Sequence, residues 1–471
     1  MSNPVYRSIN VTTGETVKEY AYCTDDEVAA ATSAAAEAGA SWGALSIAER
    51  ADIVNKVADL FIERKEELGE IITREMGKPA GEAVGEAEFS GEIFRYYAEN
   101  AEKLAADLVL EDTEESRTVV QRRPVGVLLG IMPWNYPYYQ VARFAAPNLM
   151  LGNTILLKHA ESVPESALAI ATLMKDAGVP EGVYTNLFAT HDQVSEIIKD
   201  PRVQGVSLTG SERAGAAIAA QAGGALKKAV LELGGSDPYV ILSSDDARAA
   251  ARDALAVRLE NTGQACNSNK RIIVHEDLYD EFVNEAVVQV GDLAAANPAD
   301  IQDITEQKAF GPMSSEAAAD KIVAQIGSAV EAGATLHVGG ERLSAEAGSA
   351  LAGGFFVSPA VLTDVPVGSE IYYEEFFGPV VQVYKVSSDE EALTLANDTQ
   401  YGLGSTVFAV EEGRAEAFAA GLEAGMTGVN QGAPETESMP FGGVKRSGYG
   451  RELGPLGMDE FVNKRLLSIK K

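Results

Sequence analysis

The sequence predicts an α/β protein built on doubly wound parallel sheets, and three observations support this fold class. Residues 25–105 carry only helical patterns, and from Arg117 onward short apolar strands alternate with amphipathic helices. Such alternation is typical of a parallel sheet covered by helices on both faces. A second alternating series begins near Glu232 and runs to about Asn430. The chain has 471 residues, about three times the ~150 of a usual domain, so we expect two such domains.

The N-terminal part is expected to be helical from an Ala-rich stretch at 28–40. Asp25 and Asp26 precede this stretch and are candidate N-caps, because a carboxylate can accept hydrogen bonds from the free N–H groups of the first turn. A second amphipathic run covers 47–76, and the GKP sequence at 77–79 breaks it.

Apolar, β-type runs mark the strands of both series. The strands expected in the first series are 118–121, 125–131, 154–157, 184–188 and 203–208, with helices at 165–177, 192–199 and 213–222. The strands expected in the second series are 239–242, 271–274, 380–385 and 406–410. The last residues, RLLSIKK, form a strand-like tail that is better suited to pairing with another subunit than to standing alone.

The composition excludes several classes of partner. With 70 acidic and 38 basic residues, the formal net charge is −32, and such a field repels nucleic acid and anionic membranes. We interpret the excess as a surface adapted to concentrated salt, where screening acts over ~3 Å at 1 M. No apolar run reaches the ~18 residues of a membrane helix, and the start has no secretory pattern. With only two cysteines, Cys23 and Cys266, a reducing, cytoplasmic location is expected.

Two segments suggest a nucleotide site. Val206–Ser211 is a strand that runs into a Gly-Ser turn, and Gly215 opens the next helix. A turn of this kind presents N–H donors and a positive helix end to a pyrophosphate, although a plain strand-to-helix turn explains it equally well. Lys158 ends another strand, at the sheet edge where α/β proteins bind ligands. An isolated lysine is usually only solvated.

Three residues supply the chemistry of covalent carbonyl capture. Cys266, in NTGQACNSNKR, is a candidate thiol nucleophile, Glu232, in LELGGSDP, a candidate base, and Asn135, in PWNYP, a candidate amide donor for an oxyanion. Each has a plainer explanation when taken alone: a small buried thiol, an exposed carboxylate at a strand end and a turn-forming asparagine. The polar neighbours of Cys266 argue against burial.

The combination of motifs resembles the NAD(P)-dependent aldehyde dehydrogenase superfamily over essentially the whole chain, and looks most like its succinate-semialdehyde dehydrogenase branch. The motifs occur in the family's order and are PWNYP, NLMLGNTILLK, SLTGSERAG, LELGGSDP, NTGQACNSNKR, EEFFGPV and MPFGGVKRSGYGRE.

The resemblance implies a role for each matching residue. Cys266 would be the nucleophile, Glu232 the base that activates the deacylating water, and Asn135 the oxyanion donor beside the Cys266 backbone N–H. The implied cofactor contacts are Lys158 and Glu161 on the adenosine ribose, Gly210 and Ser211 on the pyrophosphate, Glu375 on the nicotinamide ribose and Phe377 beside the ring. Trp134 is also an implied cofactor contact. The implied substrate contacts are Arg143 and Phe441, and Glu452 is a possible proton relay. No metal is implied.

The resemblance also implies a domain division and an oligomer. The NAD-binding domain would comprise 1–112 and 125–231, and the catalytic domain 232–430. An oligomerisation arm would comprise 113–124 and 462–471, and 431–461 would return to the NAD-binding domain. We expect a homodimer or a homotetramer.

Glu161 favours NAD over NADP, because a carboxylate can accept hydrogen bonds from both ribose hydroxyls but repels a 2′-phosphate. NADP remains possible.

The expected reaction is oxidation of an aldehyde to the free acid, with succinate semialdehyde as the leading substrate. Arg143 matches an arginine that faces the substrate carboxylate in that branch, and a structural arginine is the alternative. Glu260 stands where many members carry arginine, and the loop 435–438 adds acid, which should repel a dicarboxylic semialdehyde. The semialdehyde of 2-oxoglutarate and an uncharged small aldehyde are therefore alternatives. A remote alternative is a non-catalytic structural or binding protein with the same fold.

Overall fold

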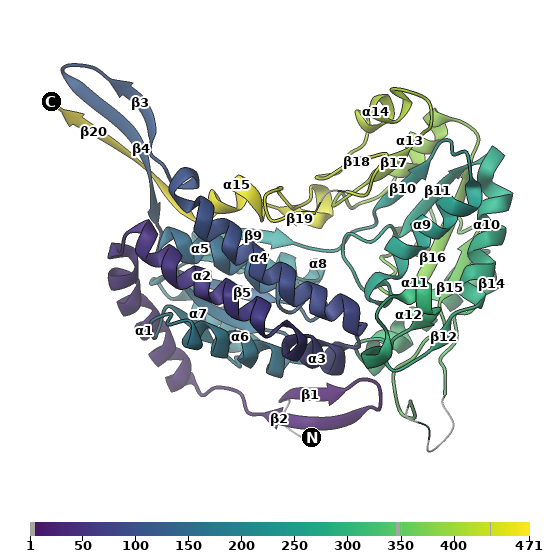
Figure 1. Cartoon of the computed structure of the whole chain (residues 1–471), viewed down its shortest axis with the longest axis horizontal. Helices are drawn as coiled ribbons and strands as arrows, with labels where there is room; N and C mark the ends of the chain where they lie inside the picture. The colour runs from purple at the N-terminus through teal and green to yellow at the C-terminus, as the bar shows by residue number, and fades with distance from the viewer. Residues whose placement is uncertain (1–4, 345–348, 350, 434) are drawn as a thin grey trace.

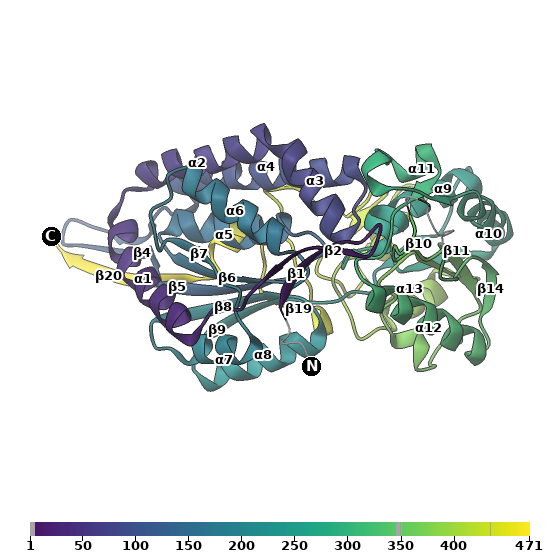
Figure 2. The ribbon, with the colours of Figure 1, turned by 90° about the horizontal axis from the view of Figure 1, so that it is seen from below.

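The computed structural model describes residues 5–344, 349, 351–433 and 435–471. It consists of two α/β bodies side by side and a narrow β arm that projects from the first body (Figure 1). Each body contains one mainly parallel sheet with helices on both faces (Figure 2). The predicted fold class is therefore confirmed.

The N-terminal helices occupy the predicted region. The bounds are α1 (Asp25–Ala44), α2 (Ile47–Glu63), α3 (Lys65–Met76) and α4 (Ala80–Leu104), after a hairpin of β1 (Tyr6–Asn10) and β2 (Glu15–Tyr20). The predicted N-cap of α1 was wrong: Thr24 is the cap, and its hydroxyl and Glu27 form a reciprocal capping box. Asp25 and Asp26 lie in the first turn, where they face the positive end of the helix dipole. The single run expected over 47–76 is divided at Arg64.

The first sheet has six strands in the order β19-β9-β8-β5-β6-β7. Its strands are β5 (Val127–Met132), β6 (Thr154–His159), β7 (Tyr184–Asn186), β8 (Val203–Thr209), β9 (Lys228–Glu232) and β19 (Gly448–Tyr449). The helices around it include α5 (Tyr139–Leu151), α6 (Pro164–Asp176), α7 (His191–Lys199) and α8 (Glu212–Gly224). All neighbours are parallel except β19, which runs antiparallel to β9 and pairs Gly448 with Glu232. This strand comes from beyond the entire second sheet in the sequence.

The second sheet has seven strands in the order β14-β15-β16-β11-β10-β17-β18. Its strands are β10 (Pro238–Ile241), β11 (Arg271–His275), β14 (Thr335–Val338), β15 (Ala360–Thr363), β16 (Val380–Val386), β17 (Thr406–Phe408) and β18 (Gly428–Val429). Its helices include α9 (Ala247–Leu259), α10 (Glu276–Gly291), α12 (Glu316–Ala332) and α13 (Asp389–Asn397). The shorter elements are α11 (Ile304–Gln307), α14 (Arg414–Ala419), α15 (Gly454–Met458), β12 (Ala294–Ala295) and β13 (Ala309–Phe310).

The arm is a three-stranded antiparallel sheet in the order β20-β4-β3. Its strands are β3 (Leu108–Asp112), β4 (Ser116–Pro124) and β20 (Val462–Lys470). The C-terminal tail therefore pairs with β4 of its own chain along its whole length, and its expected dependence on another subunit for pairing was wrong. The arm nevertheless exposes large apolar side chains, among them Leu110 (57% exposed) and Leu466 (63% exposed).

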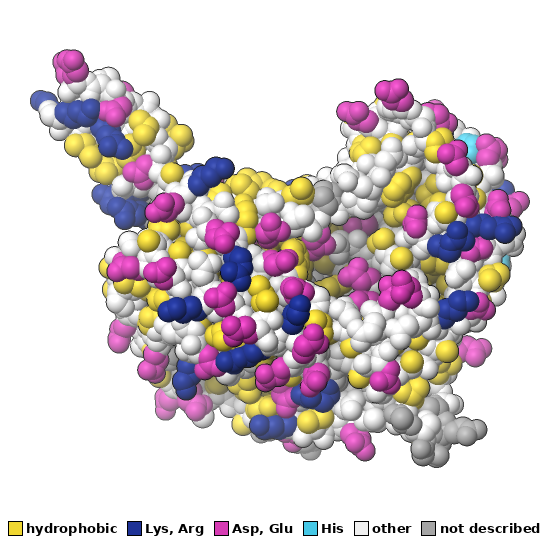
Figure 3. Space-filling view, viewed as in Figure 1, with side chains coloured by type: hydrophobic (Ala, Val, Ile, Leu, Met, Phe, Trp, Pro, Cys, Tyr) yellow, Lys and Arg dark blue, Asp and Glu magenta, His cyan; other side chains and the backbone are white. Residues whose placement is uncertain are grey.

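The surface and core match the composition. Acidic side chains are spread over the face shown in Figure 3. The central strands of both large sheets are buried between their helices, whereas the edge strand β14 is largely exposed. Across the residues that the structure describes, no helix is both long enough and apolar enough to span a membrane.

Candidate active site

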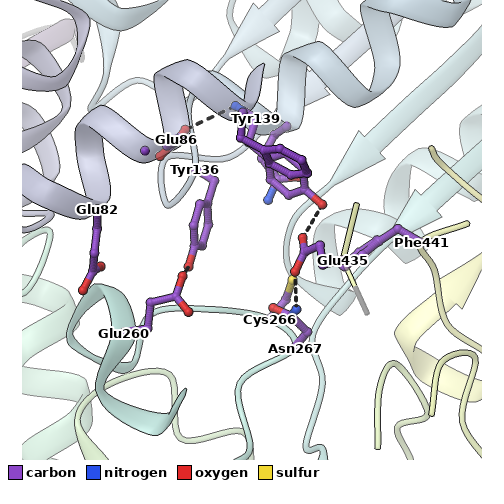
Figure 4. Close-up of a pocket in the computed structure, with 12 residues that line it drawn as sticks. Glu82, Glu86, Tyr136, Tyr139, Glu260, Cys266, Asn267, Glu435 and Phe441 are labelled. Carbon is purple, nitrogen blue, oxygen red and sulfur yellow. Dashed lines mark hydrogen bonds between the residues drawn. The ribbon is translucent and has the colours of Figure 1, made fainter. Parts of the chain in front are cut away.

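Cys266 lies where two cavities of about 370 Å³ each meet, and it lines both of them together with Gln140. The first, the glutamate-lined cavity, is shown in Figure 4. Its lining residues are Glu82, Gly85, Glu86, Phe89, Tyr136, Tyr139, Gln140, Glu260, Cys266, Asn267, Glu435 and Phe441. The second, the sheet-edge cavity, lies at the carboxyl ends of β5, β8 and β9. Its lining residues are Pro133, Trp134, Asn135, Gln140, Thr209, Gly210, Ser211, Leu233, Gly234, Cys266, Ala318, Lys321, Ile322, Gln325, Glu375 and Phe377.

Two buried cations fix the loop that carries the thiol. Lys270 Nζ donates hydrogen bonds to the carbonyl oxygens of Ala265 and Cys266, each at 2.7 Å. The guanidinium of Arg258 bonds Gly263 O at 3.2 Å and Ser268 Oγ at 2.9 Å. These bonds hold both sides of Cys266, because they join the segments before and after it to buried side chains. The loop held in this way presents the thiol to both cavities.

The surroundings of Cys266 keep its sulfur protonated in the free protein. Burial raises the pKa of the thiol to about 12. Arg143 and Lys270 act against this rise, whereas the charges of Glu435 and Glu232 add to it. The polar neighbours of Cys266 in the sequence argued against burial. The residue is indeed partly exposed at the cavities, but its sulfur is enclosed enough for burial to be the main cause of the raised pKa. A base or a bound positive charge is thus needed to form the thiolate.

Glu232 is the last residue of β9 and is only 2% exposed. Neither carboxylate oxygen has a hydrogen-bond partner in the described part of the chain. Burial raises the pKa of this carboxyl well above its usual range, and the nearby Glu452 raises it further, while Arg143 opposes the shift. An unpaired buried carboxyl with a raised pKa has the properties of a general base.

Arg143 and Glu452 form a buried ion pair beside this carboxyl. Arg143 Nε lies 2.8 Å from Glu452 Oε2. The guanidinium also stacks over the rings of Tyr139 and Phe441, at 4.5 Å and 4.2 Å from their centroids. Neither Arg143 nor Glu452 lines either cavity. Glu452 also accepts a hydrogen bond from Ser207 Oγ at 3.3 Å.

Asn135 is held next to the thiol loop. Its side-chain Nδ2 donates to Gln264 O at 3.0 Å, and its backbone carbonyl oxygen accepts from Asn261 Nδ2 at 3.0 Å. One N–H of the side-chain amide is used in this way, and the second remains for another acceptor. Glu86 fixes the start of α5, which follows this segment. Its Oε1 accepts hydrogen bonds from Tyr138 N and Tyr139 N at 2.8 and 3.2 Å.

The sheet-edge cavity fits a dinucleotide. Ser211 caps the start of α8, so the positive end of a 13-residue helix faces the cavity. At Gly210 the place of a Cβ meets only Leu208 Cδ2, at 3.7 Å, which leaves room for a phosphate. Thr209 Oγ1 is buried and without a partner among the described residues, and it is available to a ligand. Phe377 and Trp134 meet edge to face at 5.8 Å.

Other predicted cofactor residues lie nearby or are already engaged. Glu375 lines the cavity, accepts from Gly235 N at 3.0 Å and lies 3.1 Å from Lys270 Nζ. Lys158 and Glu161, at the end of β6, are 3.4 Å apart and do not line this cavity. In the residues described, no group of side chains is arranged to hold a metal ion.

The comparisons with known proteins agree with this geometry. The profile of the "Aldehyde dehydrogenase family" matches residues 2–467. The chain belongs to the aldehyde dehydrogenase family. It is therefore an NAD(P)-dependent oxidoreductase that acts on aldehydes, as the sequence motifs predicted.

Individual members of the aldehyde dehydrogenase family are similar over nearly their full length. A Deinococcus radiodurans protein named "Succinate-semialdehyde dehydrogenase, NADP(+)" is 46% identical over 98% of this chain and 94% of its own. A Mycobacterium tuberculosis protein named "Succinate-semialdehyde dehydrogenase, NADP(+), 1" is 41% identical over 97% of this chain and 98% of its own. The crystal structure of succinic semialdehyde dehydrogenase from Streptococcus pyogenes with NADP+ is 39% identical, with a TM-score of 0.93, over 99% of this chain and 100% of that one. The resemblance to the succinate-semialdehyde dehydrogenase branch is thereby confirmed.

The structure brings most of the predicted residues of this aldehyde dehydrogenase to one place and adds several that the sequence did not suggest. Lys270 was within reach of sequence reasoning, because it lies inside the motif that contains Cys266. No sequence motif of the site contains Arg258, Glu82 or Glu86, because these residues reach the site only when the chain folds. Glu435 was noticed for its charge, but its contact with the neighbour of the thiol was not: its Oε2 accepts from Asn267 Nδ2 at 3.0 Å.

Proposed function

We propose that the chain oxidises its aldehyde through a covalent adduct on Cys266 and releases a free carboxylic acid. The observation that carries this proposal is the position of Cys266 at the junction of the two cavities. A nucleophile there can hold a substrate carbon from one cavity against a nicotinamide in the other. Family membership supports the same assignment.

In the proposed mechanism, the chain's residues activate the thiol and the water in turn. Glu232 takes the proton of the Cys266 thiol, directly or through water, and the thiolate adds to the aldehyde carbon. The free N–H of Asn135 and the Cys266 backbone N–H stabilise the oxyanion. A bound NAD(P) in the sheet-edge cavity supplies the acceptor for the hydride. Glu232 then deprotonates the water that hydrolyses the thioester. The neighbouring ion pair of Arg143 and Glu452 adds no net charge to the surroundings of Glu232 during these steps.

For the substrate, we propose succinate semialdehyde, which the names of the relatives support. The expected result is formation of succinate with one equivalent of reduced cofactor per aldehyde. Cys266→Ser should abolish the reaction, and the matched control Cys23→Ser should retain it, because Cys23 lines neither of the two cavities. Undiminished turnover in Cys266→Ser would refute the proposal. An uncharged aldehyde is the second candidate, favoured by the acidic lining of the first cavity.

The relatives' names favour NADP, whereas Glu161 favours NAD. We propose that the chain binds both cofactors and that Glu161 sets their ratio. The carboxylate lies 3.4 Å from Lys158 Nζ, so a cationic group is at hand to offset its repulsion of a 2′-phosphate.

We further propose a cytoplasmic homo-oligomer with a salt-adapted surface. The exposed apolar residues of the arm support the oligomer, and the net charge of −32 supports salt adaptation. Two cysteines without a disulfide support a reducing compartment. Activity that rises with KCl would support the salt proposal, and loss of activity in molar KCl would refute it.

A further inference from the structure

The N-terminal hairpin of β1 and β2 runs along the outside of the first body (Figure 1), and its first strand holds the loop that follows β6. Tyr6, in β1, is fully buried and lines neither of the two cavities that meet at the thiol. Its hydroxyl lies 3.2 Å from two backbone carbonyl oxygens, those of His159 and Ala189. The backbone N–H of Arg7 donates to Glu161 O at 2.9 Å. Strand β1 therefore contacts the segment that carries two predicted cofactor residues.

The Lys158 ammonium group, near the end of β6, has two partners. Its Nζ lies over the Tyr6 ring, 5.5 Å from the centroid, and 3.4 Å from Glu161 Oε1. The second distance exceeds the ~2.7–2.9 Å of a close charge-assisted hydrogen bond, so the ammonium group is not committed to the carboxylate. Ring faces attract ammonium groups, and they do so more strongly when water is excluded. Lys158 is buried, so the ring is an effective second partner.

Two further aromatic rings fix the Tyr6 ring in place. The Phe188 ring packs against it with centroids 4.6 Å apart, and the Tyr22 ring meets it edge to face at 5.5 Å. Tyr20, from β2, packs against Phe188 at 5.3 Å. Burial, together with the charge of Glu161, raises the pKa of the Tyr6 hydroxyl. The phenol is therefore neutral, and the ammonium group meets an uncharged ring.

A second contact holds the loop after β6 independently of Tyr6. His159 is buried, and burial lowers its pKa to about 4, so its ring is neutral at pH 7. Its Nδ1 accepts a hydrogen bond from Ala160 N at 2.8 Å, and its Nε2 donates to Pro137 O at 2.9 Å. The backbone of the loop is thus anchored to the PWNYP segment as well as to β1. Replacing the Tyr6 ring should therefore change side-chain positions in the loop more than its backbone path.

We propose that Tyr6 is a positioning residue for NAD(P) and acts through Lys158 and Glu161. Its ring draws the ammonium group away from the carboxylate, so that the Glu161 oxygens can accept hydrogen bonds from the adenosine ribose. Without the ring, Lys158 would pair closely with Glu161, because opposite charges attract strongly in a partly buried site, and it would compete with the ribose hydroxyls. The inference rests on the NAD(P)-dependent function and the ribose contacts predicted above, and it adds a residue of the N-terminal strand to them.

Cofactor binding tests the proposal without any aldehyde. NADH and NADPH are titrated into the free enzyme at one fixed KCl concentration, and the Kd is taken from the rise in nucleotide fluorescence. Tyr6→Leu should raise the Kd for both nucleotides by about fivefold, because leucine keeps an apolar group but has no ring face. Tyr6→Phe should restore wild-type binding to within about twofold, because it loses the hydroxyl and keeps the ring.

A fluorinated ring separates electrostatics from shape. Pentafluorophenylalanine has nearly the shape of phenylalanine, but its fluorine atoms withdraw the negative charge from the ring face. Its incorporation in place of Tyr6 should weaken the binding of both nucleotides several-fold relative to Tyr6→Phe. Because the two side chains fill the same space, this comparison decides the question even if Tyr6→Leu folds poorly.

Double variants test the route through Lys158. In a Lys158→Met background, Tyr6→Leu should cause no further increase in the Kd, because the ammonium group on which the ring acts is gone. A ring that only supported the fold would cause the same loss in both backgrounds. The matched control is Tyr20→Leu, which removes a ring of the same hairpin that lies under Lys18 instead of Lys158. It should leave both Kd values unchanged.

Wild-type Kd values in Tyr6→Leu would overturn the inference. Equal binding by the fluorinated and unfluorinated rings would overturn it too, as would a full further loss in the Lys158→Met background. If Lys158→Met alone binds both nucleotides as wild type does, the predicted ribose contact is wrong and the inference falls with it. If wild type binds neither nucleotide, the proposed function itself fails.

Discussion

Arg143 Nε lies 2.8 Å from Glu452 Oε2, and both side chains are buried beside the unpaired carboxyl of Glu232. Because the two charges cancel, the ion pair adds no net charge beside Glu232, a carboxyl that must remain able to bind and release a proton. The Arg143 guanidinium also lies over the rings of Tyr139 and Phe441, and its contact with a substrate carboxylate stays a prediction.

Arg143→Met should lower stability by about 3–5 kcal/mol, because it leaves the Glu452 carboxylate buried without its partner. The double variant with Glu452→Met should recover most of this loss. Urea unfolding of wild type, both single variants and the double variant gives the four stabilities. Equal losses in the single Arg143 variant and the double variant would show that the pair makes no specific contribution.

Glu232→Gln should lower steady-state turnover by ~10²–10⁴. If Glu232 serves mainly the hydrolytic step, rapid mixing should still show a burst of reduced cofactor equal to the number of active sites, followed by slow release of acid. The control is Glu416→Gln on the exposed side of α14, which should behave as wild type. Absence of both burst and turnover would move the principal role of Glu232 to thiol activation.

Alkylation of Cys266 by iodoacetamide in the free enzyme should accelerate about tenfold for each pH unit between pH 7 and 9. A thiol with a pKa of about 12 is almost wholly protonated in this range, and its thiolate fraction grows about tenfold for each pH unit. Since the charge of Glu435 raises this pKa, Glu435→Gln should increase the rate at every pH. A rate independent of pH would contradict a protonated resting thiol.

Glu161→Gln should raise the ratio of kcat/KM for NADP to that for NAD by about tenfold, because it removes a negative charge from the predicted ribose site. The direction holds whichever cofactor wild type prefers. Steady-state kinetics with both cofactors measure it, and Glu181→Gln, an exposed loop residue, serves as control. An unchanged ratio would place the 2′-phosphate away from Glu161.

Leu110→Glu combined with Leu466→Glu should reduce the molar mass in solution to that of the monomer, because both side chains lie exposed on the arm. Light scattering coupled to size-exclusion chromatography measures the mass. Val288→Glu changes an equally exposed residue on α10 and should not alter the mass. A monomeric wild type, or a double variant with the wild-type mass, would contradict assembly through the arm.

The sequence allowed the layered fold to be predicted because strand alternation depends on local hydrophobic patterns. It misled at Thr24, because a capping box requires the reciprocal bonds between Thr24 and Glu27, and two neighbouring aspartates fit the same position equally well. The pairing of the C-terminal tail with β4 was missed for a different reason. A strand pattern gives no information on which distant strand will become its partner.

The candidate site, like the fold, could be predicted from the sequence only in part. Cys266, Glu232 and Asn135 could be selected because their residue types and surrounding turns suit the chemistry. The buried contacts of Arg258 and the bonds from Glu86 to the start of α5 depend on segments far apart in the sequence. The ion pair between Arg143 and Glu452 also depends on tertiary packing.

The antiparallel pairing of β9 with β19 has a consequence for how the protein folds. Glu232 ends one strand, and its neighbour Gly448 arrives only after the whole second sheet has been passed. Contacts of such large sequence separation form late, because closing long loops costs chain entropy before the contact stabilises anything. During refolding, most of the first sheet should acquire protected amides before the edge at Glu232 does. Recovery of catalysis should then lag behind recovery of secondary structure, with maturation of the enzyme limited by closure of this last edge.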